Sequence, residues 1–138
     1  MLLDDCLFCK IIRGELPCEK VYEDDYVLAI KDIHPMTAFH VLLLPKTHIE
    51  NYMDARLEAD QLDAFDAKCL LHMHLAAYEI AKQYDLASKG GFRIIQNNGA
   101  GVGQSVMHLH WHLTAGEDLN TGLIKAIEGL EKTRQQHE

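Results

Sequence analysis

Hydrophobic and polar positions alternate in several short stretches of the chain, and this alternation predicts strands. Residues 20–25 and 26–33 flank an acidic turn and predict a hairpin. Residues 39–45 (FHVLLLP) are almost continuously apolar and end at a proline, which is typical of a buried central strand. Residues 92–96 (FRIIQ) and 106–114 (VMHLHWHLT) predict two further strands. The chain therefore holds the strands of a sheet of about five.

A longer spacing of three or four residues marks the helices. One runs from about residue 54 to residue 84 and is followed by glycines at 90–91; its apolar stripe comprises Leu62, Phe65, Cys69, Met73, Ala76, Ile80 and Tyr84. A short helix is predicted near the start, within residues 6–17, and a weak one in the tail, within residues 119–135. Strands grouped around one long helix predict an α+β fold with a largely antiparallel sheet.

The composition fits one domain. The chain has 138 residues, 48% of them hydrophobic and 25% charged, so we treat residues 1–138 as one domain, with its core in 6–114 and a variable tail in 115–138. The net charge of −8 argues against broad contact with nucleic acid or an anionic membrane. The sequence contains neither an apolar run of about 20 residues nor a signal-peptide pattern. We therefore expect a cytoplasmic protein with reduced cysteines.

Three histidines alternate in the last predicted strand. Successive side chains of a strand point to opposite faces, so His108, His110 and His112 share one face. The residues between and after them, Leu109, Trp111 and Leu113, then face the core. A row of imidazoles suits a metal, an anion or a nucleophile better than it suits packing.

Two interpretations of this row follow from the residues. Imidazoles bind zinc, but this spacing spreads the rings over about 13 Å, so two of them could share an ion only with ligands from elsewhere. Alternatively, the glycine-rich residues 97–105 (NNGAGVGQS) offer backbone amides and the Ser105 hydroxyl to a phosphate. A neutral imidazole held in the right tautomer attacks phosphorus, and a second imidazole or the serine can protonate the leaving group.

The histidine row belongs to a longer pattern. HLHWHLT matches His-x-His-x-His followed by two mostly apolar positions, and NNGAGVGQSVMHLHWH extends the match. CLFCKII, YEDD, KDIHP and HVLLLPKTHI occur upstream in the expected order. On these motifs the chain resembles the histidine triad (HIT) family, in particular the branch of histidine triad nucleotide-binding proteins (HINT-type). The likeness runs from about Cys6 to Leu113, with two departures: Thr114 replaces an aliphatic residue and His34 a frequent serine.

The resemblance implies an adenosine 5′-monophosphoramidase-like hydrolase of purine nucleoside phosphoramidates. By this likeness, His110 is the nucleophile, which attacks the α-phosphorus and forms a nucleotidyl-histidine that water converts to AMP. His112 would bind a phosphate oxygen and help to stabilise developing charge, and Ser105 would hydrogen-bond the phosphate or the leaving nitrogen. The Gly103 amide would donate to the phosphate, and Asn97 would lie near the phosphate and the ribose.

The resemblance also assigns residues around the nucleotide. His108 and His40 would orient the nucleophile or complete its hydrogen bonds, and Asp32 would bind the ribose hydroxyls. The base would lie against an apolar wall made of Leu7, Phe8, Ile11, Ile30 and Ile33. Without the resemblance, these apolar residues are simply core.

Cys6 and Cys9 form one Cys-x-x-Cys pair, which alone is a weak indication of metal. In part of the family this pair joins two histidines around a structural zinc, and His48 and His108 occupy those positions here. The resemblance therefore implies a Cys₂His₂ zinc site and no organic cofactor.

The remaining expectations concern partners. The family pairs the long helix and the GGFRIIQ strand across a two-fold axis, so the resemblance implies a homodimer. Its ligand would be a purine nucleotide, with neither nucleic acid nor a membrane as partner. The alternatives are a purine nucleotide-binding regulatory protein with minor hydrolase activity and a zinc-binding structural module.

We interpret His72 and His74 as surface or boundary residues of the long helix, because side chains two apart on a helix do not face each other.

Overall fold

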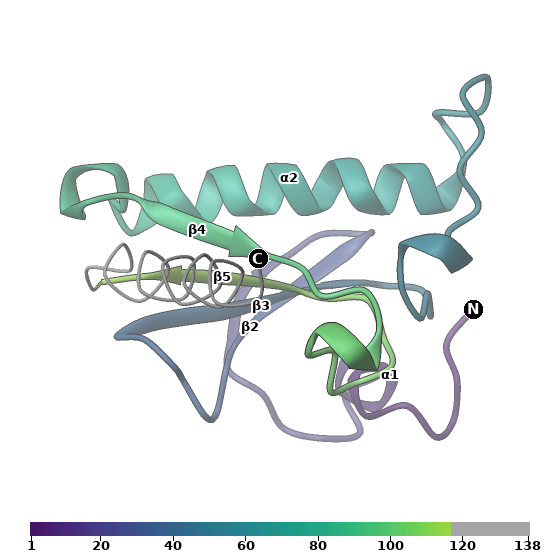
Figure 1. The fold of residues 1–138 in the computed structure, drawn as a ribbon, viewed down its shortest axis with the longest axis horizontal. Helices are drawn as coiled ribbons and strands as arrows, with labels where there is room; N and C mark the ends of the chain where they lie inside the picture. Colours follow the sequence, from purple (N-terminus) through teal and green to yellow (C-terminus); the bar gives the residue numbers. More distant parts are fainter. Residues whose placement is uncertain (117–138) are drawn as a thin grey trace, which may run out of the picture.

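A five-stranded sheet forms the centre of the computed structural model, which describes residues 1–116 (Figure 1). The elements follow one another as α1 (Leu7–Ile12), β1 (Lys20–Glu23), β2 (Val27–Lys31), β3 (Phe39–Pro45), η1 (Tyr52–Asp54), α2 (Phe65–Gln83), η2 (Ala87–Lys89), β4 (Phe92–Ile95), η3 (Ala100–Val102) and β5 (Trp111–Ala115). The strand order is β1-β2-β3-β5-β4, and every neighbouring pair is antiparallel. The predicted α+β fold is therefore confirmed.

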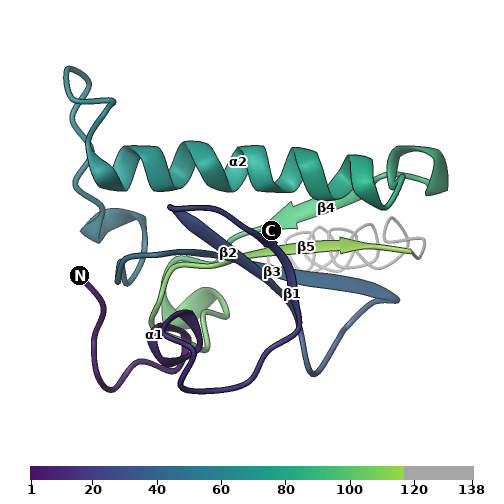
Figure 2. The same ribbon diagram turned by 180° about the vertical axis from the view of Figure 1, so that it is seen from behind.

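The two faces of the sheet carry different layers. The long helix α2 lies along one side, and α1 lies on the other (Figures 1 and 2). Along β2, Val27 and Ala29 belong to the apolar cluster beneath α2, whereas Leu28 and Ile30 belong to the cluster with Phe8 of α1. Both faces of the central strands are covered, which explains why β3 is apolar almost throughout.

The triad strand follows the predicted parity. Leu109, Trp111 and Leu113 belong to the cluster beneath α2. His112 pairs in register with Leu42 of β3, whose side chain belongs to the cluster around α1. The histidines therefore face the α1 side of the sheet.

Two predicted boundaries differ from the structure. The long helix begins at Phe65, not near residue 54, because the preceding residues form separate turns: the Gln61 N–H donates to the Glu58 carbonyl and the Ala64 N–H to the Gln61 carbonyl. Leu62, which we placed on the apolar stripe, precedes the helix and is 73% exposed. The last strand begins at Trp111, not at residue 106, because residues 106–109 bend: the His108 N–H donates to the Val106 carbonyl at 2.9 Å and the Leu109 N–H to that of Ile49 at 2.6 Å.

The end of the long helix also precedes the glycines. The helix stops at Gln83, and Asp85 adopts a left-handed conformation with φ 53°. The Leu86 N–H then donates to the Ala81 carbonyl at 2.9 Å, and Gly90 closes the following turn, η2, with φ 99°. The predicted tail helix lies outside the described residues. Within them, none of the helices has the length and hydropathy to span a membrane.

Candidate active site

The three triad histidines contact three different sets of partners. His108 lies against two cysteines, His110 lies in the middle, and His112 faces His40 of β3. The ring centroids of His110 and His112 are 5.0 Å apart, and Phe8 of α1 sets its ring edge-on to His110 at 5.1 Å. The helix α1 therefore covers the first two imidazoles, and both are buried.

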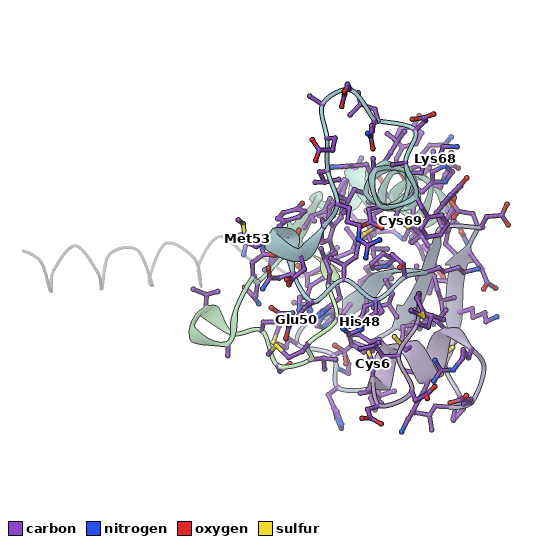
Figure 3. All side chains as sticks on the ribbon, turned by 90° about the vertical axis from the view of Figure 1, so that its right-hand side faces the viewer. Cys6, His48, Glu50, Met53, Lys68 and Cys69 are labelled. Carbon is purple, nitrogen blue, oxygen red and sulfur yellow. The ribbon has the colours of Figure 1, made fainter. Side chains whose placement is uncertain are left out.

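The predicted metal ligands do converge. Cys6 caps the start of α1 and Cys9 lies in its first turn, which places both sulfurs on the same side of the helix. The His108 Nδ1 lies 3.3 Å from the Cys6 Sγ, and the His48 Nδ1 lies 3.5 Å from the Cys9 Sγ. All four ligand atoms lie within 4.8 Å of one another, and Figure 3 shows Cys6 and His48 side by side. This is the donor set of a tetrahedral zinc site.

The protonation of His108 suits a ligand. Its Nε2 lies 3.1 Å from the Pro45 carbonyl, which can only accept, so Nε2 carries the proton. The Nδ1 lone pair therefore faces the sulfurs. A metal-binding histidine ordinarily donates its other ring N–H in this way.

His110 is held in the opposite tautomer. Its Nδ1 lies 2.7 Å from the His108 carbonyl and must donate to it. The Nε2 lone pair of the neutral ring is therefore left for another partner. This is the arrangement that a nucleophilic imidazole requires.

A chain of hydrogen bonds fixes His112. The Met36 backbone N–H donates to His40 Nδ1 at 3.1 Å, so the proton of neutral His40 sits on Nε2. That Nε2–H donates to His112 Nδ1 at 2.8 Å, which leaves the His112 proton on its own Nε2. His112 therefore presents a donor, whereas its neighbour His110 presents a lone pair.

Asp32 completes this group. Its Oδ2 lies 3.4 Å from His40 Nε2, and its Oδ1 accepts the His34 N–H at 2.8 Å. Asp32, His40 and His112 are close enough to surround an ion. However, the Met36 N–H places the His40 proton on the nitrogen that would have to bind the metal. The group is therefore better described as a hydrogen-bond network than as a second metal site.

Burial makes the imidazoles neutral. It lowers the pKa of His40 and His110 below the usual range, and for His110 a hydrogen bond to the His108 carbonyl opposes it in part. Burial, reinforced by the neighbouring imidazoles, lowers the pKa of His112 to about 4. Burial likewise lowers the pKa of His108 to about 4. At neutral pH the site is thus a row of uncharged donors and acceptors.

The glycine-rich loop lies immediately before the triad. A Cβ on Gly103 would lie 3.6 Å from the Asn97 Nδ2, so these two predicted phosphate residues are neighbours, and the Ser105 side chain is exposed. The Gly103 N–H, predicted as a phosphate donor, instead donates to the Ala100 carbonyl at 3.2 Å. That bond, at the upper end of the ordinary range, already uses the Gly103 N–H.

The predicted base wall divides into two parts. Phe8 and Ile30 are buried in the cluster beneath α1, and Ile11 packs against it. Leu7 is 47% exposed and Ile33 is 84% exposed. Their exposure leaves them free to cover a ligand, while the other three support the site from below.

Sequence reasoning missed partners that are backbone groups or distant polar side chains. The Met36 N–H and the Pro45 and His108 carbonyls give no side-chain pattern to detect. His72 is a boundary residue as predicted, but its Nδ1–H donates to Asp24 at 2.8 Å. Gln104, which we did not single out, is buried and hydrogen-bonded at the base of the loop.

Comparison with known proteins agrees with this geometry. The HIT domain family matches residues 13–119. A HIT-like protein from Synechocystis sp. is 44% identical over 115 residues, which is 83% of this chain and 93% of that protein. A HIT family hydrolase from Clostridium thermocellum has 43% identity and a TM-score of 0.74, over 85% of this chain and 95% of the other. A histidine triad protein from Clostridium difficile has 41% identity and a TM-score of 0.75, over 86% and 96%. The chain belongs to the HIT domain family.

Proposed function

We propose that the protein is a nucleotidyl hydrolase that cleaves the P–N bond of purine nucleoside 5′-phosphoramidates, such as adenosine 5′-monophosphoramidates. The observation that carries this proposal is the tautomer of His110, whose Nδ1–H is held by the His108 carbonyl at 2.7 Å. This leaves the Nε2 of a neutral ring as a nucleophile beside a glycine-rich loop. The name of the hydrolase from Clostridium thermocellum supports the reaction class.

The reaction has two displacements at phosphorus. The His110 Nε2 attacks the α-phosphorus, the P–N bond breaks, and the amine leaves with the bonding electrons and takes a proton from Ser105. Water then attacks phosphorus, returns a proton to that donor and releases AMP from His110. His112 donates its Nε2–H to a phosphate oxygen on which charge develops. Asp32 binds the ribose hydroxyls, and the apolar wall binds the base.

The test is replacement of the nucleophile. His110→Ala should reduce kcat/KM for adenosine phosphoramidate by about 10⁴-fold, or roughly 5.5 kcal/mol of transition-state stabilisation. AMP binding should survive, because Asp32 and the base wall are unchanged. His112→Ala should lose less activity and leave a nucleotidyl adduct that rapid-quench mass spectrometry maps to His110.

Other outcomes would overturn this function. An adduct on another residue, or near-normal turnover by His110→Ala, contradicts the mechanism. AMP binding without significant turnover in the natural protein would instead favour a purine nucleotide-binding regulatory protein. Turnover that survives chelation would show that any metal is not part of the chemistry.

We also propose that Cys6, Cys9, His48 and His108 hold a structural zinc ion. Two sulfurs and two Nδ1 atoms converge, and the Pro45 carbonyl fixes the tautomer of His108. Zinc bound there would join the start of α1 to the segment after β3 and to the triad. The described cysteines are free thiols, which fits a reducing cytoplasm, where we place the protein.

Finally, we propose a homodimer. The outer side of α2 exposes Leu71, Leu75 and Tyr78, and the edge strand β4 exposes Phe92 and Ile94. Exposed apolar residues on an edge strand and a neighbouring helix suit pairing with a second copy across a two-fold axis.

A further inference from the structure

Gln104 is the single buried residue of the glycine-rich loop, residues 97–105. Its side chain is 3% exposed, although it directly precedes the exposed Ser105. Its carboxamide is fully used: the Oε1 accepts the Gly99 N–H at 2.8 Å, and the Nε2 donates to the Glu50 carbonyl at 2.6 Å and to the Val106 carbonyl at 3.1 Å. One side chain therefore connects the beginning of the loop, its end and the segment after β3.

These bonds close the loop into a ring. The Gln104 N–H adds a backbone bond to the Gly99 carbonyl at 3.1 Å. The Val106 carbonyl also accepts the His108 N–H at 2.9 Å, so the end of the ring is joined to the first triad histidine. Ser105 thus lies between two hydrogen-bonded neighbours, Gln104 and Val106, in the segment that leads to His110.

Packing does not hold this loop. Gly99 and Gly103 have φ of 115° and 100°, and Val102, its largest apolar side chain, is 65% exposed. A loop rich in glycine has many accessible conformations, so its shape must come from hydrogen bonds. The buried carboxamide supplies three of them in one place.

We propose that Gln104 is a positioning residue, which sets the phosphate-facing shape of the loop without touching the substrate. It acts through Ser105, Asn97 and the Gly103 amide, the loop groups that the sequence predicts near the phosphate. The expected effect of Gln104 on the rate of turnover rests on the proposed hydrolase function. Its effect on phosphate binding can be measured without turnover.

The experiment compares Gln104→Met with the natural protein. Methionine keeps the length of the side chain but removes all three hydrogen bonds, so the Gly99 N–H and the Glu50 carbonyl lose this partner, while the Val106 carbonyl keeps the His108 N–H. We expect kcat and the affinity for AMP each to fall by about 10-fold to 100-fold. The affinity for adenosine, which has no phosphate, should fall much less, because Asp32 and the base wall lie outside the loop.

Gln104→Glu gives a second test by pH. A carboxylate still accepts the Gly99 N–H, but its other oxygen faces the Glu50 and Val106 carbonyls and repels them. Protonation would restore one donor. The activity of this variant, relative to the natural protein at the same pH, should therefore rise from neutral to mildly acidic pH.

Ile80→Val is the matched control, because it removes a buried methyl group of α2 on the side that faces the sheet and lowers stability without touching the loop. This control should change neither the affinity for AMP nor the affinity for adenosine. The proposal fails if Gln104→Met weakens adenosine as much as AMP, or if Gln104→Glu shows no relative gain in acid. A natural protein that binds AMP but does not turn over would overturn the proposed hydrolase, while the AMP and adenosine affinities would still decide the role of Gln104.

Discussion

At the scale of single residues, the site is defined by where protons sit on imidazole rings. His108, His110 and His112 are chemically identical, yet backbone groups give each a different role. The Pro45 carbonyl turns the His108 Nδ1 toward the cysteines, the His108 carbonyl exposes the His110 Nε2, and the Met36 N–H, through His40, makes His112 a donor. Since burial keeps these rings neutral, hydrogen bonds rather than charge distinguish them.

His40 is therefore expected to control His112. His40→Leu removes the N–H that holds the His112 Nδ1, so His112 can adopt the tautomer without an Nε2–H. We expect kcat to fall by about 10-fold to 100-fold, as for other supporting partners of reactive groups. His40→Gln offers an N–H of similar reach and should recover part of the rate. Steady-state kinetics of both variants check this, and equal rates for the two would contradict a role through hydrogen bonding.

The sequence predicted the members of this site better than their arrangement. The alternation of the triad and the Cys-x-x-Cys pair identified residues that do converge, because strand parity and helical spacing fix their faces. The tautomers were not predictable, since Met36, Pro45 and His108 act there through backbone atoms, which every residue shares. Gln104 was missed for a related reason: its importance comes from burial, which the loop sequence does not reveal.

At the scale of elements, a polar contact joins the β1–β2 turn to α2. The Asp24 Oδ2 accepts from the Tyr22 hydroxyl at 2.7 Å and from the His72 Nδ1–H at 2.8 Å. Its Oδ1 accepts the Tyr26 and Val27 N–H groups, at 2.7 and 2.9 Å. One carboxylate thus shapes the hairpin turn and fastens it to the long helix. The sequence predicted the hairpin and the helix separately, but not this contact, because His72 lies 48 residues from Asp24.

We expect Asp24→Ala to lower the free energy of unfolding by about 2–3 kcal/mol near neutral pH, because it leaves several partners without an acceptor. His72→Ala should cost less, since it removes one bond of four. Glu79→Ala is the control: Glu79 pairs with Lys82 at 3.8 Å on the surface of α2, and such pairs contribute about 0–1 kcal/mol. Urea unfolding measures all three, and a loss for Asp24→Ala no larger than for the control would contradict this role.

The pH dependence of this contact has a definite sign. Burial alone would raise the pKa of Asp24, but hydrogen bonds from His72, Tyr22, Tyr26 and Val27 outweigh it and lower the pKa below the ordinary 3.8. A carboxyl group whose pKa is lower in the folded protein than in the unfolded chain stabilises the fold at pH values above the unfolded-state pKa. This contribution is lost as the pH falls through the lower pKa of the folded protein. The difference between Asp24→Ala and the natural protein should therefore persist to pH 3.8 and shrink only below it.

At the scale of the whole molecule, the two sides of the sheet have separate tasks. The α1 side carries the triad histidines with Cys6 and Cys9, and the α2 side carries the larger apolar cluster. The helix start that the sequence placed wrongly shows the limit of periodicity: Leu62 continues the apolar spacing of the helix, but it is 73% exposed and lies before α2. Periodicity reports where apolar residues recur, whereas burial decides where a helix begins.

The exposed apolar residues of α2 and β4 lead to a prediction about assembly. Light scattering should find the natural protein as a dimer at micromolar concentration. Leu71→Glu places a charge on the outer side of α2 and should give a folded monomer, because an unpaired charge in an apolar interface is costly. Leu62→Glu, at an equally exposed leucine before the helix, should remain a dimer. A natural monomer, or a dimeric Leu71→Glu, would reject this interface.

The proposed zinc site makes the last prediction, because it concerns how α1 is held to the rest of the molecule. Burial raises the pKa of the Cys9 thiol to about 11 and lowers that of His48. Metal binding near neutral pH must therefore displace a proton from Cys9, whereas the His48 nitrogen is already free. Zinc affinity should consequently rise with pH, and titration calorimetry in buffers of different ionisation enthalpy should detect the released proton.

Cys9→Ser should purify without zinc and melt at a lower temperature, while the half-buried Cys18→Ser, outside the ligand set, should keep the metal. Stabilisation by the ion reaches about 4 kcal/mol when free zinc exceeds its dissociation constant 1,000-fold. His110 should still form the nucleotidyl adduct in Cys9→Ser, because the His108 carbonyl that holds it belongs to the backbone. Metal retained by Cys9→Ser, or a natural protein purified without chelators that contains none, would reject the site. Loss of the adduct on chelation of the natural protein would instead show that the metal holds the nucleophile in place as well as the fold.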